Sequence, residues 1–316
     1  MSASSLLSLV LAGCAGPEEA AAPGSATILP TADGDDLYLL DTDEAELVWY
    51  SPSAGTMRTS NLESTPGRLT RAGKTIWVTL PEARSIAVVE DDLFALNRVG
   101  TIPTGADPFG IVANVDGTRL YVALRDEGEV QELSTDGEVL RSWAVEGQPS
   151  WLGLSPDGGG LYVGSAIGGH LTWVDLVGGT TEEVILPAPL RADEGNRAFT
   201  QRVTGDLAVS ADGDLLGVPL LLVDHFTTGG TPDAPNTTSY YVNTNTGLGR
   251  FNPTIALVHL DADGRPDGPG ASLVLVATDL IWSYPSSVSF APDGSFAVAT
   301  MEASASAVAF STRPST

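Results

Sequence analysis

The sequence predicts an all-β protein, a β-propeller of four-stranded blades, and three observations lead to this prediction. A short turn-and-strand unit recurs along the chain, with a period near forty residues that is typical of radial β arrays. Most copies open on Asp-Gly, a strong hairpin signal. The 316 residues include 35 Gly and 21 Pro, and no long helical period is present. The copies are DGDDLYLL (33–40), AGKTIWVTL (72–80), DGTRLYVAL (116–124), DGGGLYVGS (157–165), DGDLLGVPL (212–220) and DGSFAVATM (293–301).

One large side chain holds a nearly constant place in each copy. In the first four copies it is aromatic, and in the last two the nearest equivalents are shifted by one or two places. The residues are Tyr38, Trp77, Tyr121, Tyr162, Leu216 and Phe296. We expect the aromatic members to be buried between strands.

The third copy shows the plan of a whole blade. Its four apolar segments are separated by polar turns, two of which are Asp-Gly. The four segments are Gly110–Val115, Arg119–Leu124, Glu129–Ser134 and Glu138–Val145. Four antiparallel strands in about forty residues predict one propeller blade.

Repeating this plan divides the chain into a leader, six blades and one insert. Proline opens four of the blades, which fits a connector because proline is excluded from mid-sheet positions. We expect a signal and tether at 1–25, an insert at 224–252, and blades near 26–64, 66–106, 108–147, 149–187, 203–278 and 285–316. The sixth blade has three expected strands. An open ring leaves unpaired edges, so we expect an incomplete seven-bladed ring that lacks its C-terminal part.

Several of these motifs resemble the YVTN-repeat β-propellers, a group of secreted or surface proteins of bacteria and archaea. The resemblance rests on Ser155-Pro156-Asp157-Gly158, Ala291-Pro292-Asp293-Gly294 and Leu161-Tyr162-Val163. It implies a closed ring of seven blades and an envelope location, but no particular activity. Blade five departs from the pattern, because Leu215-Leu216-Gly217-Val218 lacks the aromatic residue.

The charge narrows the classes of partner. The chain carries 40 acidic and 15 basic residues, a formal net charge of −25. Such a balance argues against nucleic acid and against anionic membrane surfaces as partners. The carboxylates are expected to solvate turns and rims.

The N-terminus indicates export and lipid anchoring. An apolar run, Leu6–Gly13, ends in Leu11-Ala12-Gly13-Cys14, which matches the bacterial lipoprotein signal and makes Cys14 the lipidated residue. The small, acidic stretch Ala15–Ser25 fits a tether. We therefore expect a cell-envelope lipoprotein that faces the periplasm or lies on the outer membrane. No Lys or Arg precedes the run, so a frayed N-terminus with an accidental cysteine stays an alternative.

Two long irregular stretches are the expected binding elements. Ala188–Thr204 connects blades four and five, and Asp224–Asn252 joins the second and third strands of blade five. Propeller topology places both over one mouth of the channel, and long loops are often functional. The candidate binding residues are Arg197, Arg202, Asp224, His225, Tyr240, Tyr241 and Arg250. Alternatively, the arginines pair with local acids such as Asp193 and Glu194.

Signals for catalysis are weak, so no catalytic residue, metal site or cofactor is predicted in this chain. It has three histidines, and neither His-Glu-x-x-His nor Cys-x-x-Cys-His occurs. Asp261-Ala262-Asp263-Gly264 fits a hairpin turn better than a calcium loop.

Three functions follow in order of preference. The first is a non-enzymatic envelope binding or scaffold module for a protein partner or an adjacent domain. The second, implied by the family resemblance, is the propeller half of a truncated c-type haem electron-transfer or peroxidase-like protein. The third is a lactonase-like hydrolase, which would need Glu, Asp, Asn and His on the inner strands.

Overall fold

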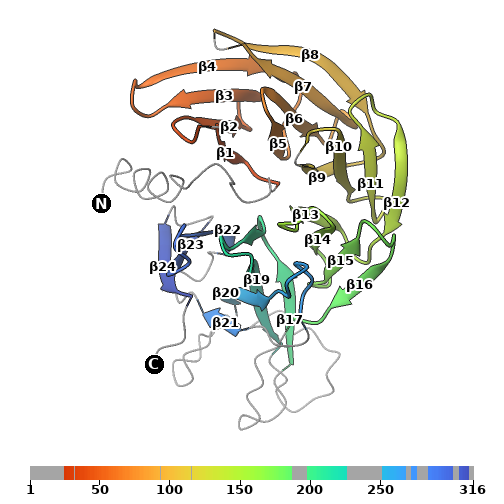
Figure 1. Ribbon diagram of the computed structural model, residues 1–316, viewed down its shortest axis with the longest axis vertical. Coiled ribbons are helices and arrows are strands. Elements are labelled where there is room, and N and C mark those ends of the chain that lie inside the picture. Colours follow the sequence, from red (N-terminus) through yellow and green to blue (C-terminus); the bar gives the residue numbers. More distant parts are fainter. Residues whose placement is uncertain are drawn as a thin grey trace.

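The chain forms a β-propeller whose blades are arranged around a central axis (Figure 1). The computed structural model describes residues 25–31, 33–92, 94–114, 116–186, 198–225, 251–267, 272–275, 284–301 and 306–312. Within these ranges the regular structure is entirely strand, with six antiparallel sheets. The predicted fold class is therefore confirmed. No apolar helix long enough to cross a membrane occurs in this part of the chain.

Blades one to four are four-stranded meanders, and each uses its strands in sequence order. Blade one contains β1 (Ile28–Pro30), β2 (Leu37–Asp41), β3 (Glu46–Ser51) and β4 (Thr56–Asn61). Blade two contains β5 (Leu69–Ala72), β6 (Thr75–Leu80), β7 (Ser85–Asp91) and β8 (Leu96–Pro103). Blade three contains β9 (Pro108–Ala113), β10 (Arg119–Leu124), β11 (Glu129–Ser134) and β12 (Val139–Ala144). Blade four contains β13 (Pro149–Leu154), β14 (Gly160–Ser165), β15 (Leu171–Asp175) and β16 (Thr181–Val184).

Blades five and six differ from this plan. In blade five, β17 (Ala198–Val203) and β18 (Ala208–Val209) both pair with the long β19 (Leu215–His225), which is followed by β20 (Phe251–His259) and β21 (Ser272–Leu275). Blade six contains β22 (Pro285–Phe290), β23 (Phe296–Met301) and β24 (Ser306–Ser311). The connection expected over 188–204 thus ends in a strand, because residues 198–203 pair with residues 220–225.

The aromatic residues of the repeat connect neighbouring blades. Tyr38 and Tyr162 are buried on the second strands of blades one and four. The Tyr38 hydroxyl donates to Asp91 of blade two over 2.8 Å, and the Tyr162 hydroxyl donates to the Gly264 carbonyl of blade five. In blades one and four, the aromatic residue therefore packs the interior and also forms a hydrogen bond with the next blade.

The register explains why the copy in blade five lacks the aromatic residue. Gly217 pairs with Ala208, at the register position that Tyr162 holds in blade four. A side chain at Gly217 would collide with Val288 and Phe290 of blade six, because its Cβ would lie 2.7 Å from the Val288 side chain. Blade six thus fills this space from the other side of the interface.

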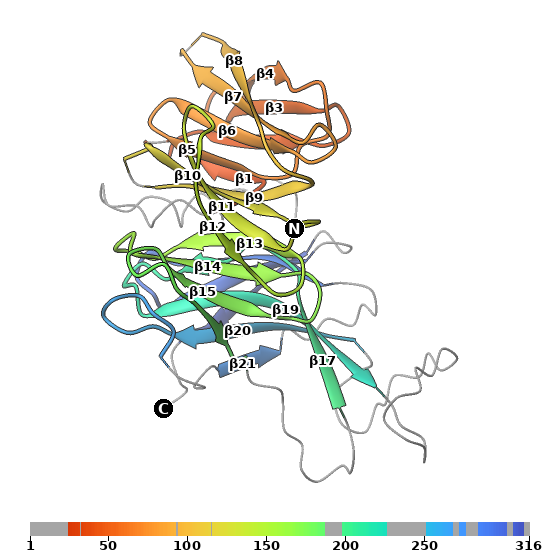
Figure 2. The same ribbon diagram turned by 90° about the vertical axis from the view of Figure 1, so that its right-hand side faces the viewer.

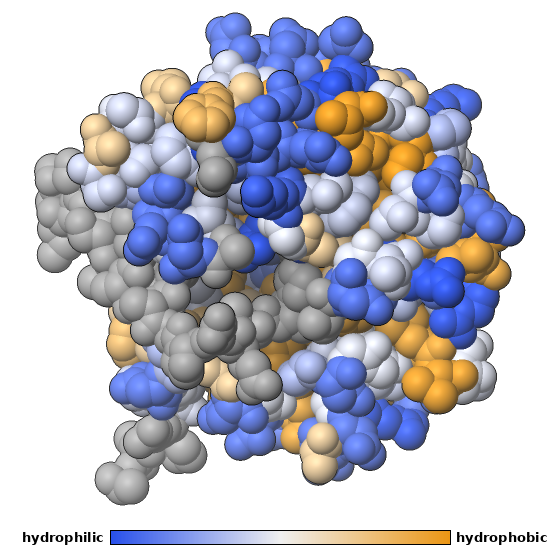
Figure 3. Space-filling model, turned by 45° about the horizontal axis from the view of Figure 1, so that its top comes forward, coloured by the Kyte–Doolittle hydropathy of each residue, from blue (hydrophilic) through white to orange (hydrophobic). Residues whose placement is uncertain are grey.

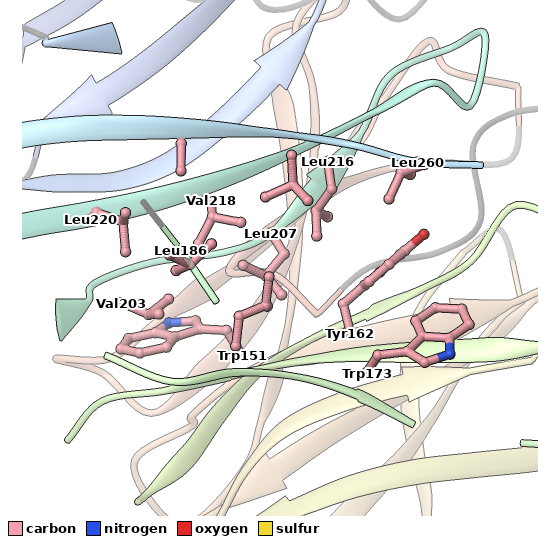
Figure 4. Packing of buried hydrophobic residues seen from close by; sticks show 13 residues of the cluster. Trp151, Tyr162, Trp173, Leu186, Val203, Leu207, Leu216, Val218, Leu220 and Leu260 are labelled. Carbon is pink, nitrogen blue, oxygen red and sulfur yellow. The ribbon is translucent and has the colours of Figure 1, made fainter. Parts of the chain in front are cut away.

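Apolar clusters fill the interfaces between consecutive blades. Figure 4 shows the cluster between blades four and five, where Trp151, Tyr162 and Trp173 face leucine and valine side chains of blade five. The rings of Tyr162 and Trp173 have centroids 5.0 Å apart. Four further clusters lie between blades one and two, two and three, three and four, and five and six. Burial of apolar surface between radial sheets is the main stabilising contribution in this arrangement.

The ring has two faces, which differ in the loops that they carry. We call the side with the inter-blade connections and the loops between second and third strands the loop face. The opposite side, with the turns between first and second strands, is the turn face. In blade five β17 and β19 run well past the neighbouring blades (Figure 2). Because Ala198 pairs with His225 at the second-to-third-strand end of β19, this extension projects from the loop face.

Candidate functional site

The central channel is crossed by the chain itself just before blade one. The Ser25 amide donates to the Leu152 carbonyl over 3.1 Å, and the Ser25 hydroxyl accepts the Ile111 amide over 3.1 Å. Ala26 forms an antiparallel bridge with Leu69. One short segment therefore contacts the inner strands of blades two, three and four. Ser25 is 1 % exposed, so this segment is buried at the centre of the ring.

The three contacts use corresponding positions of the repeat. In their own blades, Leu69, Ile111 and Leu152 pair with valines of the second strand, at Val78, Val122 and Val163. Inner strands lie next to the axis and expose one edge of backbone polar groups. Ser25 and Ala26 satisfy part of these edges, as buried backbone groups require.

An ion pair also spans the ring. Arg68 directly precedes β5 in blade two, and Asp206 lies between β17 and β18 in blade five. The Arg68 Nε atom lies 2.7 Å from Asp206 Oδ1, and Arg68 Nη1 donates to the Gly67 carbonyl over 3.0 Å. Burial raises the pKa of the Asp206 carboxyl, and the Arg68 charge and hydrogen bond act in the opposite direction. Arg68 therefore offsets part of the free-energy cost of burying this carboxyl group.

Beside Arg68, the loop face carries a pocket between blades two and three. We call it the loop-face pocket, and its volume is about 460 Å³. It is lined by Thr65, Pro66, Gly67, Pro81, Glu82, Arg84, Asp107, Phe109, Arg125 and Asp126. These residues come from the two inter-blade connections and the two second-to-third-strand loops of this pair of blades. The ring architecture therefore brings together four short loops that are distant in sequence.

Phe109 organises the inner wall of the loop-face pocket. The guanidinium carbons of Arg68 and Arg125 lie 4.7 and 4.1 Å from the centre of its ring. Arg125 also binds Asp107 through two hydrogen bonds of 2.8 Å each. Stacking and bidentate pairing fix the plane of this guanidinium, and its Nη1 atom has no partner among the described residues.

Three charged groups at the rim of the same pocket remain uncommitted. The side chains of Arg84, Glu82 and Asp126 are exposed and form no hydrogen bond or ion pair with any residue that the structure describes. Arg84 has φ of 49°, a left-handed conformation, and the corresponding turn of blade three has Gly128 with φ of 65°. Ala45 of blade one, with φ of 55°, shows that the turn itself accepts a non-glycine residue.

A second pocket lies between the same two blades on the turn face. Its volume is about 450 Å³, and we call it the turn-face pocket. It is lined by Ala72, Gly73, Thr75, Trp77, Val88, Asp116, Gly117 and Thr135. Asp116 is its single charged lining residue, and the Asp116 carboxylate already accepts the Thr118 hydroxyl over 2.6 Å. The two pockets therefore differ in chemistry although they match in size.

The structure describes three of the seven predicted binding residues. Arg202 lies on β17, while Asp224 and His225 lie at the end of β19, which pairs with β17. Arg202 is exposed on the loop-face extension. The other four, and the lipidation candidate, lie outside the described residues: Arg197, Tyr240, Tyr241, Arg250 and Cys14.

Sequence analysis missed the loop-face pocket. Two of its segments, Pro66-Gly67 and Pro108-Phe109, carry a sequence signal for blade connectors but none for a pocket. The turn prediction at Asp261 is confirmed, because its Oδ1 accepts the amides of Asp263 and Arg265 within a tight loop. His170 pairs with Glu183 over 2.7 Å. In the described ranges, no three His, Cys, Asp or Glu residues are grouped so as to hold a metal ion.

The surface agrees with the acidic composition. Figure 3 shows hydrophilic side chains over much of the visible face, with smaller apolar areas between them. Most charged groups of the chain are carboxylates, with 40 acidic against 15 basic residues. The loop-face pocket places the unpaired Arg84 side chain on this acidic surface.

Comparisons with known proteins identify the fold. A putative 6-phosphogluconolactonase from Bacteroides fragilis superposes with a TM-score of 0.59 at 17% identity, over 90% of this chain and 79% of that chain. Kuenenia stuttgartiensis hydrazine synthase matches with a TM-score of 0.58 at 16% identity, over 94% and 98% of the two chains. No family model and no curated protein matches the sequence. Similarity at this level of identity shows a shared β-propeller fold.

Proposed function

We propose that this protein is a binding and scaffold module of the cell envelope, non-enzymatic by itself, related to the YVTN-repeat propellers, and that it binds its partner on the loop face. The partner is a protein segment or an adjacent domain. Two features support this proposal. The loop-face pocket and the blade-five extension both lie on the loop face.

The contrast between the two pockets is the observation that carries this proposal. Both lie between blades two and three, at about 460 and 450 Å³. The loop-face pocket combines an aromatic ring with arginines, which are the residue types that most often anchor interfaces. The turn-face pocket has neither an arginine nor an uncommitted charge. This difference supports the loop face as the binding face for a partner.

Anchoring at Cys14 would hold this module close to a membrane. The segment between Cys14 and Ser25 has about ten residues, and an extended chain of that length spans at most about 35 Å. Ser25 is fixed at the centre of the ring rather than at its periphery. An anchor at Cys14 would therefore connect to the propeller at the centre of the ring.

A hydrolytic function of the lactonase type receives less support. The lactonase name belongs to a structural neighbour that shares the fold at 17% identity. In the present chain, Ser25, Ala26 and the Arg68–Asp206 pair occupy the centre of the ring, where such a reaction would need space for a substrate. The electron-transfer alternative depends on a further domain and stays a sequence-based expectation.

Paired variants of the full-length protein test the proposed binding face. Envelope proteins that co-purify with the tagged chain from its own host are quantified for wild type, Arg84→Asp and Asp116→Asn. We expect Arg84→Asp to lose a defined set of proteins that wild type and Asp116→Asn both retain. Equal retention in all three, or equal loss in both variants, would contradict binding through the loop face.

A further inference from the structure

We infer that the loop-face pocket binds a zwitterionic ligand, namely a short peptide segment or amino acid that carries a cationic and an anionic group together. This inference rests on the proposed binding function and specifies its ligand. Neither a purely anionic nor a purely cationic ligand matches the groups that the pocket leaves uncommitted.

The donors come from two arginines. Arg84 presents a whole guanidinium group without a partner among the described residues, and Arg125 presents its Nη1 edge. A guanidinium fork binds a carboxylate through two parallel hydrogen bonds. Because Asp107 and Phe109 hold Arg125 in place, part of this site is ordered before the ligand arrives.

The acceptors are the two rim carboxylates. Glu82 and Asp126 come from the second-to-third-strand loops of neighbouring blades and line the same pocket as Arg84. Both are exposed and lack a partner among the described residues. An ammonium or guanidinium group of the ligand could bind there while its carboxylate binds Arg84.

The electrostatic field of the whole protein favours a zwitterion over a simple anion. The protein carries a net charge of −25, so an anion is repelled as it approaches even if Arg84 attracts it at contact. A zwitterion has no net charge and avoids this repulsion. A simple cation is attracted from afar but leaves Arg84 and the free edge of Arg125 without acceptors.

The size and the walls of the pocket limit the ligand further. A volume of about 460 Å³ lies at the small end of typical ligand sites. Pro66, Pro81 and Phe109 provide apolar surface between the charged groups. A ligand with two charges separated by a short aliphatic or peptide spacer fits this pattern.

Titration of the full-length protein with three probes tests the ligand class. The probes are the dipeptide Lys-Glu, the dianion glutarate and the dication cadaverine, all at equal ionic strength. Binding is followed by calorimetry and by amide chemical shifts around Gly67, Arg84 and Phe109. We expect saturable binding of Lys-Glu, with at least about tenfold weaker binding of both single-sign probes.

Substitutions complete the test. Arg84→Gln, and Glu82→Gln combined with Asp126→Asn, should each weaken Lys-Glu binding at least about tenfold, whereas Asp116→Asn in the turn-face pocket should leave it unchanged. All replaced side chains are exposed, so the melting temperature should confirm an intact fold. Tight binding of glutarate or cadaverine alone, no saturable binding of Lys-Glu, or indifference to Arg84→Gln would overturn the inference.

This outcome is separable from the test of the proposed function. If Lys-Glu fails while Arg84→Asp still loses its co-purifying proteins, the loop face binds a partner and the ligand class is wrong. If both fail, the binding face itself is wrong.

Discussion

Arg68 and Asp206 are 138 positions apart in the sequence and form an ion pair across the centre of the propeller, with Nε 2.7 Å from Oδ1. The pair links blade two to the opposite blade five. Arg68 also stacks over Phe109, the aromatic wall of the loop-face pocket. The centre of the ring and the proposed binding site are therefore one connected structure.

Arg68→Met should destabilise the protein in a pH-dependent manner. Without Arg68, burial alone acts on Asp206 and raises the pKa of its carboxyl further in the folded state, while the unfolded value stays near about 4. When the pKa of a carboxyl is higher in the folded than in the unfolded state, the protein loses stability as the pH rises from the unfolded pKa to the folded pKa. We expect a loss of about 3–5 kcal/mol at pH 7 and a smaller loss near the unfolded pKa, measured by urea unfolding.

Arg265→Met provides the matched control for this prediction. Arg265 pairs with Glu182 on the exposed surface, where ion pairs contribute little. The free energy of unfolding of Arg265→Met should differ from that of the wild type by less than about 1 kcal/mol, both at pH 7 and near the unfolded pKa of Asp206. An Arg68→Met loss that does not vary with pH would show that Asp206 is not the responsible carboxyl.

Tyr162→Ala should cost about 3–5 kcal/mol, because it removes a fully buried aromatic side chain from the interface of blades four and five. Tyr162→Phe should cost about 1 kcal/mol, since it leaves the Gly264 carbonyl without its donor. Tyr121 makes no side-chain hydrogen bond with a described residue, so Tyr121→Phe should cost less than about 0.5 kcal/mol. Equal losses for the two phenylalanine variants would contradict the inter-blade role of the Tyr162 hydroxyl.

Ser25→Ala should destabilise the centre of the ring by about 1–3 kcal/mol, because the buried Ile111 amide loses its acceptor. Hydrogen exchange should report this change as faster exchange at Ile111, with little effect in blade six. Ser53→Ala, at an exposed position of blade one, should change stability by less than about 0.5 kcal/mol. An Ile111 amide that exchanges rapidly in the wild type would contradict a stable buried hydrogen bond to Ser25.

Arg84→Gly should leave the stability unchanged or raise it by about 1 kcal/mol, since glycine accepts the left-handed conformation at no steric cost. The same variant should lose ligand binding. Gly128→Ala, at the corresponding turn of blade three, should instead lower the stability by about 1 kcal/mol. A thermal-shift series with and without the Lys-Glu probe measures both effects, and a binding-competent Arg84→Gly would dismiss Arg84 as a ligand contact.

Cys14→Ser should move the protein from the membrane fraction to the soluble fraction of its host, because it removes the proposed lipid attachment residue. Detergent-free fractionation and mass spectrometry of the mature N-terminus measure this change. Ser2→Ala, upstream of the apolar run, is the control that should still partition with membranes. Membrane retention of Cys14→Ser would remove the lipoprotein proposal without affecting the binding face.

The repeat made the fold readable from sequence. Asp-Gly turns and the places of Tyr38, Trp77, Tyr121 and Tyr162 depend on local turn and strand chemistry, which leaves a pattern along the chain. Gly217 shows the limit of that reading, since its interface is filled by Phe290 of the following blade. The sequence indicates that blade five lacks the aromatic residue, but it does not indicate that Phe290 of blade six fills the space.

The candidate site was much less predictable, because it depends on contacts between distant segments. Ser25 appeared to end a tether and instead lies against Ile111 and Leu152. Arg84 and Asp126 become neighbours only when two blades pack side by side. The sequence drew attention to the long stretches 188–204 and 224–252, and their described residues belong to β17 and β19 on the loop face. The loop-face pocket is instead lined by short loops.

Site-specific photocrosslinking tests the central claim most directly. A photoreactive phenylalanine analogue is placed at Thr65 in the loop-face pocket or at Thr135 in the turn-face pocket of the full-length protein, and cells are irradiated. Binding on the loop face predicts discrete crosslinked species from position 65 that disappear when Arg84→Asp is added, and none of these species from position 135. The same species from position 135, or none from position 65, would contradict the account.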